Sequence, residues 1–516
     1  GATRNGFPGD VILQFLSIIL LTATLREIVF SGSLWHFKWP LIFAGALVFF
    51  PVMQLLPLPP ELWNRLPGRA LIAETYVLID RPLPPLPLTM SPSATWLSGL
   101  ALLPPVAVFL GTLTLGHGQR RHISYVIIAM GVGSVFLGLL QLAEGPNSSL
   151  RFYEITNRTE AVGFFANRNH FAALLYATML FAAAHLVDAI GVAGQTTPRR
   201  RLASNIVLPL LTWLTALLML TAAQLMARSR AGLFLTDIAL AATIALGMTD
   251  RRIKASSRGF VRWVVASSAA VIFLLLPLAL YRIFDRFGAD PYGDARITFA
   301  RKTASAAYAY MPFGSGLGSF VPVYQLFETT PDLGLTYANH AHNDFLEVWL
   351  ETGIFGLALM GVFGAWVIQR TASVWRETLP EVRSIDTGLA RAASVIILLL
   401  LAHSLVDYPL RTTAMMTVAS VALAFLFRPA QFHVQRRAAH SAGPTDGENS
   451  QFQRRPRPPV SHEPWTPNGD WPEAWQRTSS TRRGPSSPSG QPDDATTVAA
   501  DHEQNPVQTA GESGDN

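Results

Sequence analysis

The chain has no cysteine and few charged residues. None of its 516 residues is cysteine, and Asp, Glu, Lys and Arg together make up 14% of them. A typical soluble domain has about 25% charged residues. The absence of cysteine excludes disulfides, thiolate metal sites and a cysteine nucleophile. The shortage of charge, together with a hydrophobic content of 50%, indicates a protein that resides largely in a membrane.

The hydrophobic residues are concentrated before about residue 428. A membrane-spanning helix needs about 20 apolar residues. Runs of this length lie near 10–30, 38–56, 95–114, 122–143, 168–190, 204–226, 231–248, 259–281, 345–369, 389–408 and 411–428. The sequence therefore predicts an all-α, polytopic bundle of about 11–12 transmembrane helices.

The remainder of the chain differs in composition. Residues 429–516 are rich in Pro, Ser, Gly, Arg and Asp, so they cannot bury enough apolar surface to offset chain entropy and are predicted to be a disordered tail. We expect N-terminal helices over 1–160, a main membrane domain over 161–428 and then this tail. Trp465, Trp471 and Trp475 could bind partners of a membrane scaffold, but a dispensable linker is favoured.

The basic residues predict how the chain is oriented. They are concentrated in short connecting segments at 116–122, 191–204, 249–262 and 370–391. Cytoplasmic loops carry an excess of Lys and Arg, so these segments and the tail are predicted to be cytoplasmic. This distribution also argues against nucleic acid as a partner, despite the net charge of +6. Eleven spans would place the N-terminus outside, and a missed or trimmed first span would place it inside.

Several polar motifs then fall on the non-cytoplasmic side. Asn167, Arg168 and Asn169 precede one predicted span. They are suited to binding headgroups or a polar ligand, but helix capping and interfacial anchoring are favoured by the chemistry alone. Arg228 and Arg230 lie between two spans with almost no loop. Guanidinium forks match phosphate oxygens, and snorkelling at the membrane surface explains such arginines equally well.

A long polar loop, 282–344, follows on the same side. It carries several basic residues, including Arg296 and Arg301, and then the glycine-rich run Met311–Phe320. The run lacks the βαβ context of a dinucleotide-binding motif, so it is predicted to form a tight turn. Residues 296–310 are predicted to form an amphipathic helix at the membrane interface.

The loop ends in a cluster of His, Asn and Asp. His342 is suited to be a general base because imidazole titrates near neutral pH. His340 and His342 lack obvious further ligands, so neither a metal nor another cofactor is expected. Asn343 or Asp344 fits a helix N-cap. Asp407 and Arg411, in the last predicted hairpin, are interpreted as a structural ion pair.

Taken in order, these motifs resemble a known family. The matching segments are GFFANRNHFA at 163–172, SRAG at 229–232, an arginine-containing helix at 296–310 that leads into PFGSGLGSF at 312–320, and HNDFLEVWLETGIFG at 342–356. Their order and spacing resemble those of the O-antigen ligase/polymerase family of bacterial inner-membrane proteins. The resemblance covers about residues 160–430.

The resemblance implies an activity and a location. Members transfer glycan from an undecaprenyl-diphosphate carrier to a hydroxyl or amine at the periplasmic face, without a metal. The acceptor is lipid A-core, a growing glycan or a protein, and other polysaccharide-assembly proteins are expected partners. We therefore expect an inner-membrane enzyme with a periplasmic active face and a cytoplasmic tail.

The resemblance also assigns roles to individual residues. His342, Arg230 and Arg296 correspond to the functional residues of the family, with Arg301 as the rival of Arg296. Arg228 and His340 have no clear counterpart. The residues expected to contact substrate are Arg301, Asn167, Arg168, Asn169, Asn343 and Asp344.

The chemistry of the reaction is consistent with these assignments. A departing diphosphate gains negative charge, which guanidinium groups can stabilise, and His342 can accept the proton of the acceptor hydroxyl. Single displacement would invert the anomeric configuration. The alternative class is a transporter or flippase of lipid-linked sugars, which would carry ionisable residues within its spans or broken helices in paired positions. The ionisable residues here cluster at span ends, which favours an enzyme.

Overall fold

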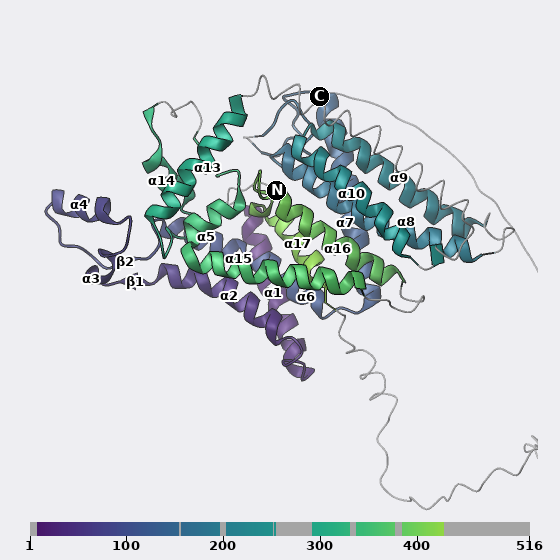
Figure 1. Cartoon of the computed structure of the whole chain (residues 1–516), viewed down its shortest axis with the longest axis horizontal. Helices are drawn as coiled ribbons and strands as arrows, with labels where there is room; N and C mark the ends of the chain where they lie inside the picture. Colours follow the sequence, from purple (N-terminus) through teal and green to yellow (C-terminus); the bar gives the residue numbers. More distant parts are fainter. Residues whose placement is uncertain are drawn as a thin grey trace, which may run out of the picture. The chain divides into compact units, whose positions relative to one another are not determined.

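The computed structural model describes residues 8–153, 156–196, 203–250, 252–253, 291–330, 337–376 and 384–427. The predicted span 259–281, the start of the predicted loop 282–344 and the predicted tail 429–516 lie outside these residues. Within them the protein is built from helices (Figure 1), and the strands described, β1 (Pro57–Leu58) and β2 (Leu86–Pro87), form one short antiparallel pair. The all-α prediction is therefore confirmed.

The described part of the chain contains 9 helical stretches long and apolar enough to span a membrane. They are α1 (Pro8–Phe30), α2 (Lys38–Leu55), α5 (Pro92–Ala101) continued by α6 (Leu103–Leu113), α7 (His117–Glu144), α8 (Arg168–Gln195), α9 (Ser204–Ala227), α10 (Arg230–Thr249), α15 (Asp344–Arg376) and α16 (Ser384–His403). The last predicted span is a shorter apolar helix, α17 (Thr413–Phe425). Short helices connect these elements, namely α3 (Pro60–Trp63), α4 (Ala70–Leu78), α13 (Pro291–Ala309), α14 (Phe320–Tyr324), η1 (Gln325–Phe327) and η4 (Pro409–Arg411).

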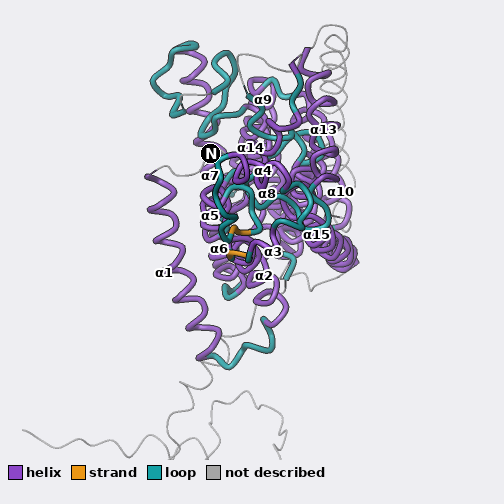
Figure 2. Tube along the Cα trace, turned by 90° about the vertical axis from the view of Figure 1, so that its left-hand side faces the viewer, coloured by secondary structure: helices purple, strands orange, loops and turns teal. Residues whose placement is uncertain are grey.

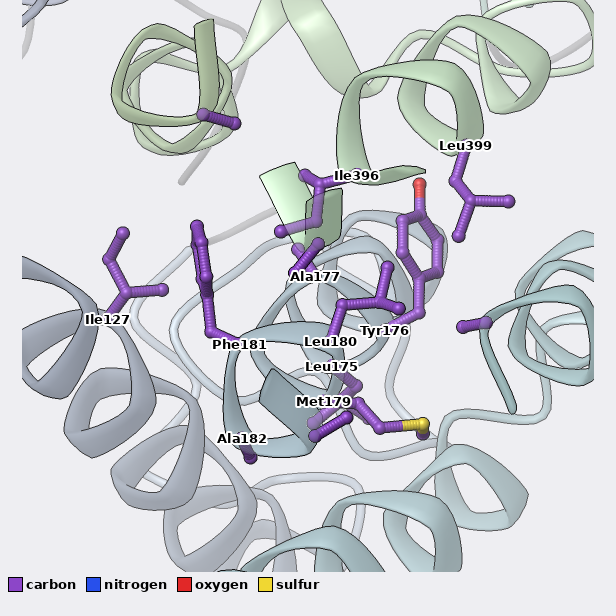
Figure 3. Packing of buried hydrophobic residues seen from close by; sticks show 14 of the residues in the cluster. Ile127, Leu175, Tyr176, Ala177, Met179, Leu180, Phe181, Ala182, Ile396 and Leu399 are labelled. Carbon is purple, nitrogen blue, oxygen red and sulfur yellow. The ribbon is translucent and has the colours of Figure 1, made fainter. Parts of the chain in front are cut away.

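Helix α8 forms the centre of the bundle. It packs against α7, α9, α10 and α16, and its residues Tyr176 and Phe181 are fully buried (Figure 3). Small residues allow the close approach, because a Cβ added at Gly232 of α10 would lie 2.5 Å from Ala172 Cβ of α8. By contrast, α1 lies at the periphery (Figure 2). A helix that is apolar on every face is expected in the interior of a bundle, which is the position of α8.

Ion pairs link the basic segments at one end of the bundle. Arg121 Nε lies 2.7 Å from Asp386 Oδ1, and Arg252 Nη2 lies 2.7 Å from Asp188 Oδ1. Ser124 lies one turn after Arg121, and His185 lies one turn before Asp188. Because His185 Nε2 is 2.8 Å from Ser124 Oγ, the two ion pairs lie at the same end of the bundle. Three of the segments predicted to be cytoplasmic thus have described residues, Arg121, Arg252 and Asp386, at this end of the bundle. The side of the membrane on which they lie stays a prediction.

The glycine-rich run forms the predicted turn at the other end of the bundle. Gly314, Gly316 and Gly318 all have positive φ, a conformation that favours glycine. The four amides from Ser315 to Gly318 donate to Leu350 O, Glu351 O, Gln54 Oε1 and Glu351 Oε1 at 2.8–2.9 Å. Because protein groups already accept these four hydrogen bonds, the turn is not a phosphate-binding glycine loop.

The N-terminal helices help to hold this turn. Gln54 of α2 also donates to Glu351 O over 3.0 Å, and Met90 N donates to Ser315 O over 2.7 Å. The side chain of Thr95 in α5 donates to Leu317 O over 2.7 Å. The first 160 residues therefore contribute directly to the surroundings of the site.

Helix α15 is broken at Gly353, and this break makes a testable prediction. Gly353 has φ +60, and an added Cβ would lie 2.1 Å from Pro312 O. We expect Gly353→Ala to destabilise the protein by more than about 2 kcal/mol, since it combines left-handed strain with a clash against backbone. Thermal unfolding of the purified protein in detergent measures this change.

The same helix offers a matched control. A Cβ at Gly361 meets nothing within 4 Å, so Gly361→Ala should leave the unfolding temperature unchanged or slightly higher. Equal unfolding temperatures for the two variants would contradict the interpretation.

Candidate active site

His342 lies just before α15 in an unusual backbone conformation. Its φ is +50, a region that costs a residue with a side chain about 1–2 kcal/mol. Its Nδ1 lies 3.2 Å from Oδ1 of Asp407, which is 65 residues further along the chain. With Nδ1 held by the carboxylate, Nε2 is the ring nitrogen left for chemistry. The side chain of His342 is 23% exposed and that of Asp407 is 1% exposed, so the pair has one buried and one accessible member.

Asp407 is held from two sides. Its Oδ2 accepts a hydrogen bond from Asn169 Nδ2 at the start of α8. Burial alone would raise the pKa of Asp407, but the hydrogen bond with His342 and the neighbouring imidazoles of His170 and His403 outweigh it and bring the pKa below its usual range. The carboxylate is therefore ionised at neutral pH. It favours the tautomer of His342 with the proton on Nδ1 and stabilises the imidazolium.

Aromatic rings enclose the histidine. Phe299 of α13 stacks on His342 with ring centroids 6.0 Å apart, and Tyr408 meets the His342 ring edge-on at 4.9 Å. Tyr408 also contacts His340 at 4.4 Å and His170 at 5.1 Å. The predicted helix at 296–310 is thus confirmed as part of α13, and it packs directly over the catalytic candidate.

The three predicted arginines lie in different settings. Arg296 precedes Phe299 by about one turn of α13, so the two share a face, and its charge acts on His403 beside Asp407. Arg301 is exposed on the same helix. Arg230 begins α10, where Ser229 Oγ accepts a hydrogen bond from Gly232 N over 3.0 Å. Gly232, two residues after Arg230, packs against the start of α8. Arg230 therefore lies at the same end of the bundle as His342.

The start of α8 contains three predicted substrate-contacting residues. Asn167 Oδ1 accepts a hydrogen bond from Asn169 N over 2.8 Å, which confirms the capping interpretation. Arg168 Nη1 pairs with Glu160 Oε1 at 2.6 Å. Of these three side chains, the structure brings Asn169 to Asp407 and Asn167 to Tyr408, whereas Arg168 has a partner that fixes the helix start. Contact with substrate stays a prediction for each.

The start of α15 is capped in a similar way. Asn343 Oδ1 accepts from Leu346 N over 3.0 Å, and Asn343 Nδ2 donates to Leu405 O over 2.9 Å. Asp344 is buried, and its Oδ2 accepts from Ser404 Oγ over 2.7 Å. The N-cap prediction is confirmed for Asn343, and both residues tie α15 to the end of α16.

The prediction for the last hairpin was wrong. Arg411 pairs with carboxylates of α15 instead of Asp407, and Asp407 pairs with His342. Sequence reasoning therefore missed Asp407 as a site residue. The available signal was its position on the same predicted side of the membrane as His342. Among the described residues no group of three His, Asp or Glu side chains is placed to hold a metal ion.

The fold and the site define a class of protein. It is a multi-pass membrane protein with a buried aspartate and an accessible histidine paired at one end of its bundle. Residues 214–361 match the family model described as O-antigen ligase. This match supports the resemblance to the O-antigen ligase/polymerase family that the ordered motifs predict. No curated protein matches the chain.

The low pKa of Asp407 predicts how its contribution to stability varies with pH. A carboxyl with a depressed pKa stabilises the fold fully above its ordinary pKa near 4, and loses that effect as the pH falls through the folded value. The wild-type protein should therefore exceed Asp407→Asn in stability by an amount on the order of 1–3 kcal/mol. This difference should not shrink between pH 7 and about pH 5, and it should fall only below about pH 4.

Thermal unfolding of both proteins in detergent across this pH range measures the difference. A difference that already shrinks between pH 7 and pH 6 would show that burial dominates and raises the pKa.

Proposed function

We propose that the protein is a glycosyltransferase that uses an undecaprenyl-diphosphate-linked glycan as donor and a hydroxyl as acceptor at the periplasmic face of the inner membrane. The family match supports an O-antigen ligase-type membrane protein. The pairing of His342 with the buried carboxylate of Asp407 is the observation that carries the proposal, because a weak hydroxyl nucleophile needs a base held in one tautomer.

The proposed reaction is a single displacement. The acceptor oxygen attacks the anomeric carbon while its proton passes to Nε2 of His342. The bond between that carbon and the diphosphate oxygen breaks, and its electron pair stays with the leaving diphosphate. Asp407 keeps the proton on Nδ1 in place and stabilises the positive ring that forms. Attack opposite the leaving group inverts the anomeric configuration.

Arginines are proposed to bind the diphosphate. Negative charge grows on the leaving group as the carbon–oxygen bond breaks, and fixed guanidinium groups stabilise it without reorganisation. Arg296 shares a helix face with Phe299, which stacks on His342, and is the arginine best supported by position. Arg230 is proposed to contribute from the start of α10. The exposed side chain of Arg301 is proposed to make an outer contact with the substrate.

A transporter for the same lipid-linked sugars is the competing function. Two observations favour it: Asp237 lies within α10, and α15 is broken at Gly353. The break, however, is closed by protein, since Ile354 N donates to Pro312 O over 2.9 Å. The buried Glu347 and Glu351 lie in the first turns of α15, beside the site and not in the middle of a span. The described arrangement favours chemistry at the membrane surface.

Deletion of the gene, followed by complementation with wild type or His342→Ala, tests the proposal. Surface polysaccharide and extracted undecaprenyl-linked glycans are then analysed by gel. Long lipid-linked polymer with bare lipid A-core would indicate a ligase, and accumulated single repeat units would indicate a polymerase. Units held on the cytoplasmic face would overturn the proposal in favour of a flippase.

A further inference from the structure

A single buried carboxylate fixes the two residues before His342. Glu347, in the first turn of α15, is 1% exposed. Its Oε1 lies 2.8 Å from His340 Nδ1, and its Oε2 accepts a hydrogen bond from Ala341 N over 3.0 Å. A residue with a side chain keeps a left-handed conformation only where its surroundings enforce it. Glu347 on the preceding backbone and Asp407 on the ring are two of the contacts that hold His342 in this way.

Arg411 faces Glu347 together with two further carboxylates. Its side chain lies 3.4 Å from Asp344, 3.5 Å from Glu347 and 2.9 Å from Glu351. These three acids are three and four residues apart on one face of α15. Burial alone would lower the pKa of Arg411, but the three carboxylates raise it by more than burial lowers it. The guanidinium therefore stays charged. Removing such a cation leaves buried carboxylates uncompensated.

The turn between α16 and α17 thus reaches His342 along two routes. Asp407 contacts the ring directly, and Arg411 contacts the carboxylate that binds residues 340 and 341. Tyr408, between them in the chain, packs against both His340 and His342. We propose that Glu347 and Arg411 are positioning residues, which set the backbone of His342 so that its Nε2 meets the acceptor hydroxyl. The inference rests on the proposed function and deepens it.

A positioning role differs measurably from a merely structural ion pair. A misplaced base lowers turnover, and a displacement of about 1 Å can cost about 10²-fold. We therefore expect Glu347→Ala to lower kcat by about 10²-fold while KM for the lipid-linked donor stays within about 3-fold, because the arginines proposed to bind the diphosphate are on other helices. In a His342→Ala background, Glu347→Ala should cause no further loss, since its effect passes through His342.

The experiment uses the purified full chain in nanodiscs with a lipid-linked donor and a sugar acceptor. Glu347→Gln keeps an acceptor for Ala341 N and should retain more activity than Glu347→Ala. Arg411→Lys keeps the charge but loses the fork, so its kcat should also fall. Asp386→Asn is the matched control, because Asp386 is another poorly exposed, ion-paired carboxylate and lies at the opposite end of the bundle. Its kcat should equal that of wild type.

The outcomes separate the inference from the proposed function. An inactive wild type, with glycan transfer also absent in cells, would overturn the proposed function. An active wild type, an inactive His342→Ala and a Glu347→Ala variant with kcat within about 2-fold of wild type would overturn only the inference. The inference would also be overturned if Glu347→Ala lowered kcat by the same factor in the wild-type and His342→Ala backgrounds. If Glu347→Ala fails to fold, Glu347→Gln replaces it in the same comparison, and equal losses in both backgrounds again overturn the inference.

Discussion

Replacement of His342 by alanine is expected to lower glycan transfer by about 10²–10⁴-fold, the usual contribution of a positioned general base. Affinity for the donor should change little, because a proton acceptor acts on the hydroxyl of the other substrate. Asp407→Asn should cause a loss of the same order, since an amide in place of the carboxylate favours the wrong tautomer of His342 and cannot stabilise its positive form. Steady-state transfer from a lipid-linked donor in nanodiscs measures both effects.

The control for this prediction is a histidine at the other end of the bundle. His122 lies in the first turns of α7 and is exposed, so His122→Ala should transfer glycan at the wild-type rate. Full activity of His342→Ala at normal abundance in the membrane would rule out His342 as the base. Full activity of Asp407→Asn would rule out a catalytic role for the His342–Asp407 pair, but His342 could still act as a base without the carboxylate.

Replacement of Arg296 by alanine is expected to have the second large effect, a loss of about 10²–10³-fold in turnover. The reason is that its charge reaches the surroundings of Asp407 and is proposed to stabilise the departing diphosphate. Arg296→Lys should recover only part of the activity, because an ammonium group cannot bind two phosphate oxygens as a planar fork does. Transfer rates measured at several donor concentrations separate turnover from binding.

Arg301 is the matched comparison for Arg296. Both arginines lie on α13, but the side chain of Arg301 is exposed. We expect Arg301→Ala to raise KM for the donor by less than about 10-fold, which corresponds to roughly 1.4 kcal/mol, and to leave kcat close to wild type. The reverse ranking of the two variants would make Arg301, in place of Arg296, the arginine that stabilises the departing diphosphate.

Local patterns in the sequence determined much of this architecture. The length and spacing of the apolar runs predicted the spanning helices, since a helix that crosses a bilayer needs a fixed number of apolar residues. The sequence predicted an N-cap at Asn343 or Asp344, because capping depends on residues within one turn, and the structure identifies Asn343 as the cap. The glycines at 314–318 marked a turn because their positive φ values are costly for other residues.

Tertiary structure alone decided how these elements form a site. The partner of His342 is 65 residues away, and Asn169, which binds the same carboxylate, is 238 residues from it. Asp407 and Arg411, close in the sequence, separate because Arg411 meets the carboxylates on one face of α15 while Asp407 meets His342. Sequence spacing identifies pairs within one helix. Pairs between helices depend on which faces the packed bundle brings together, so they were beyond prediction from the sequence.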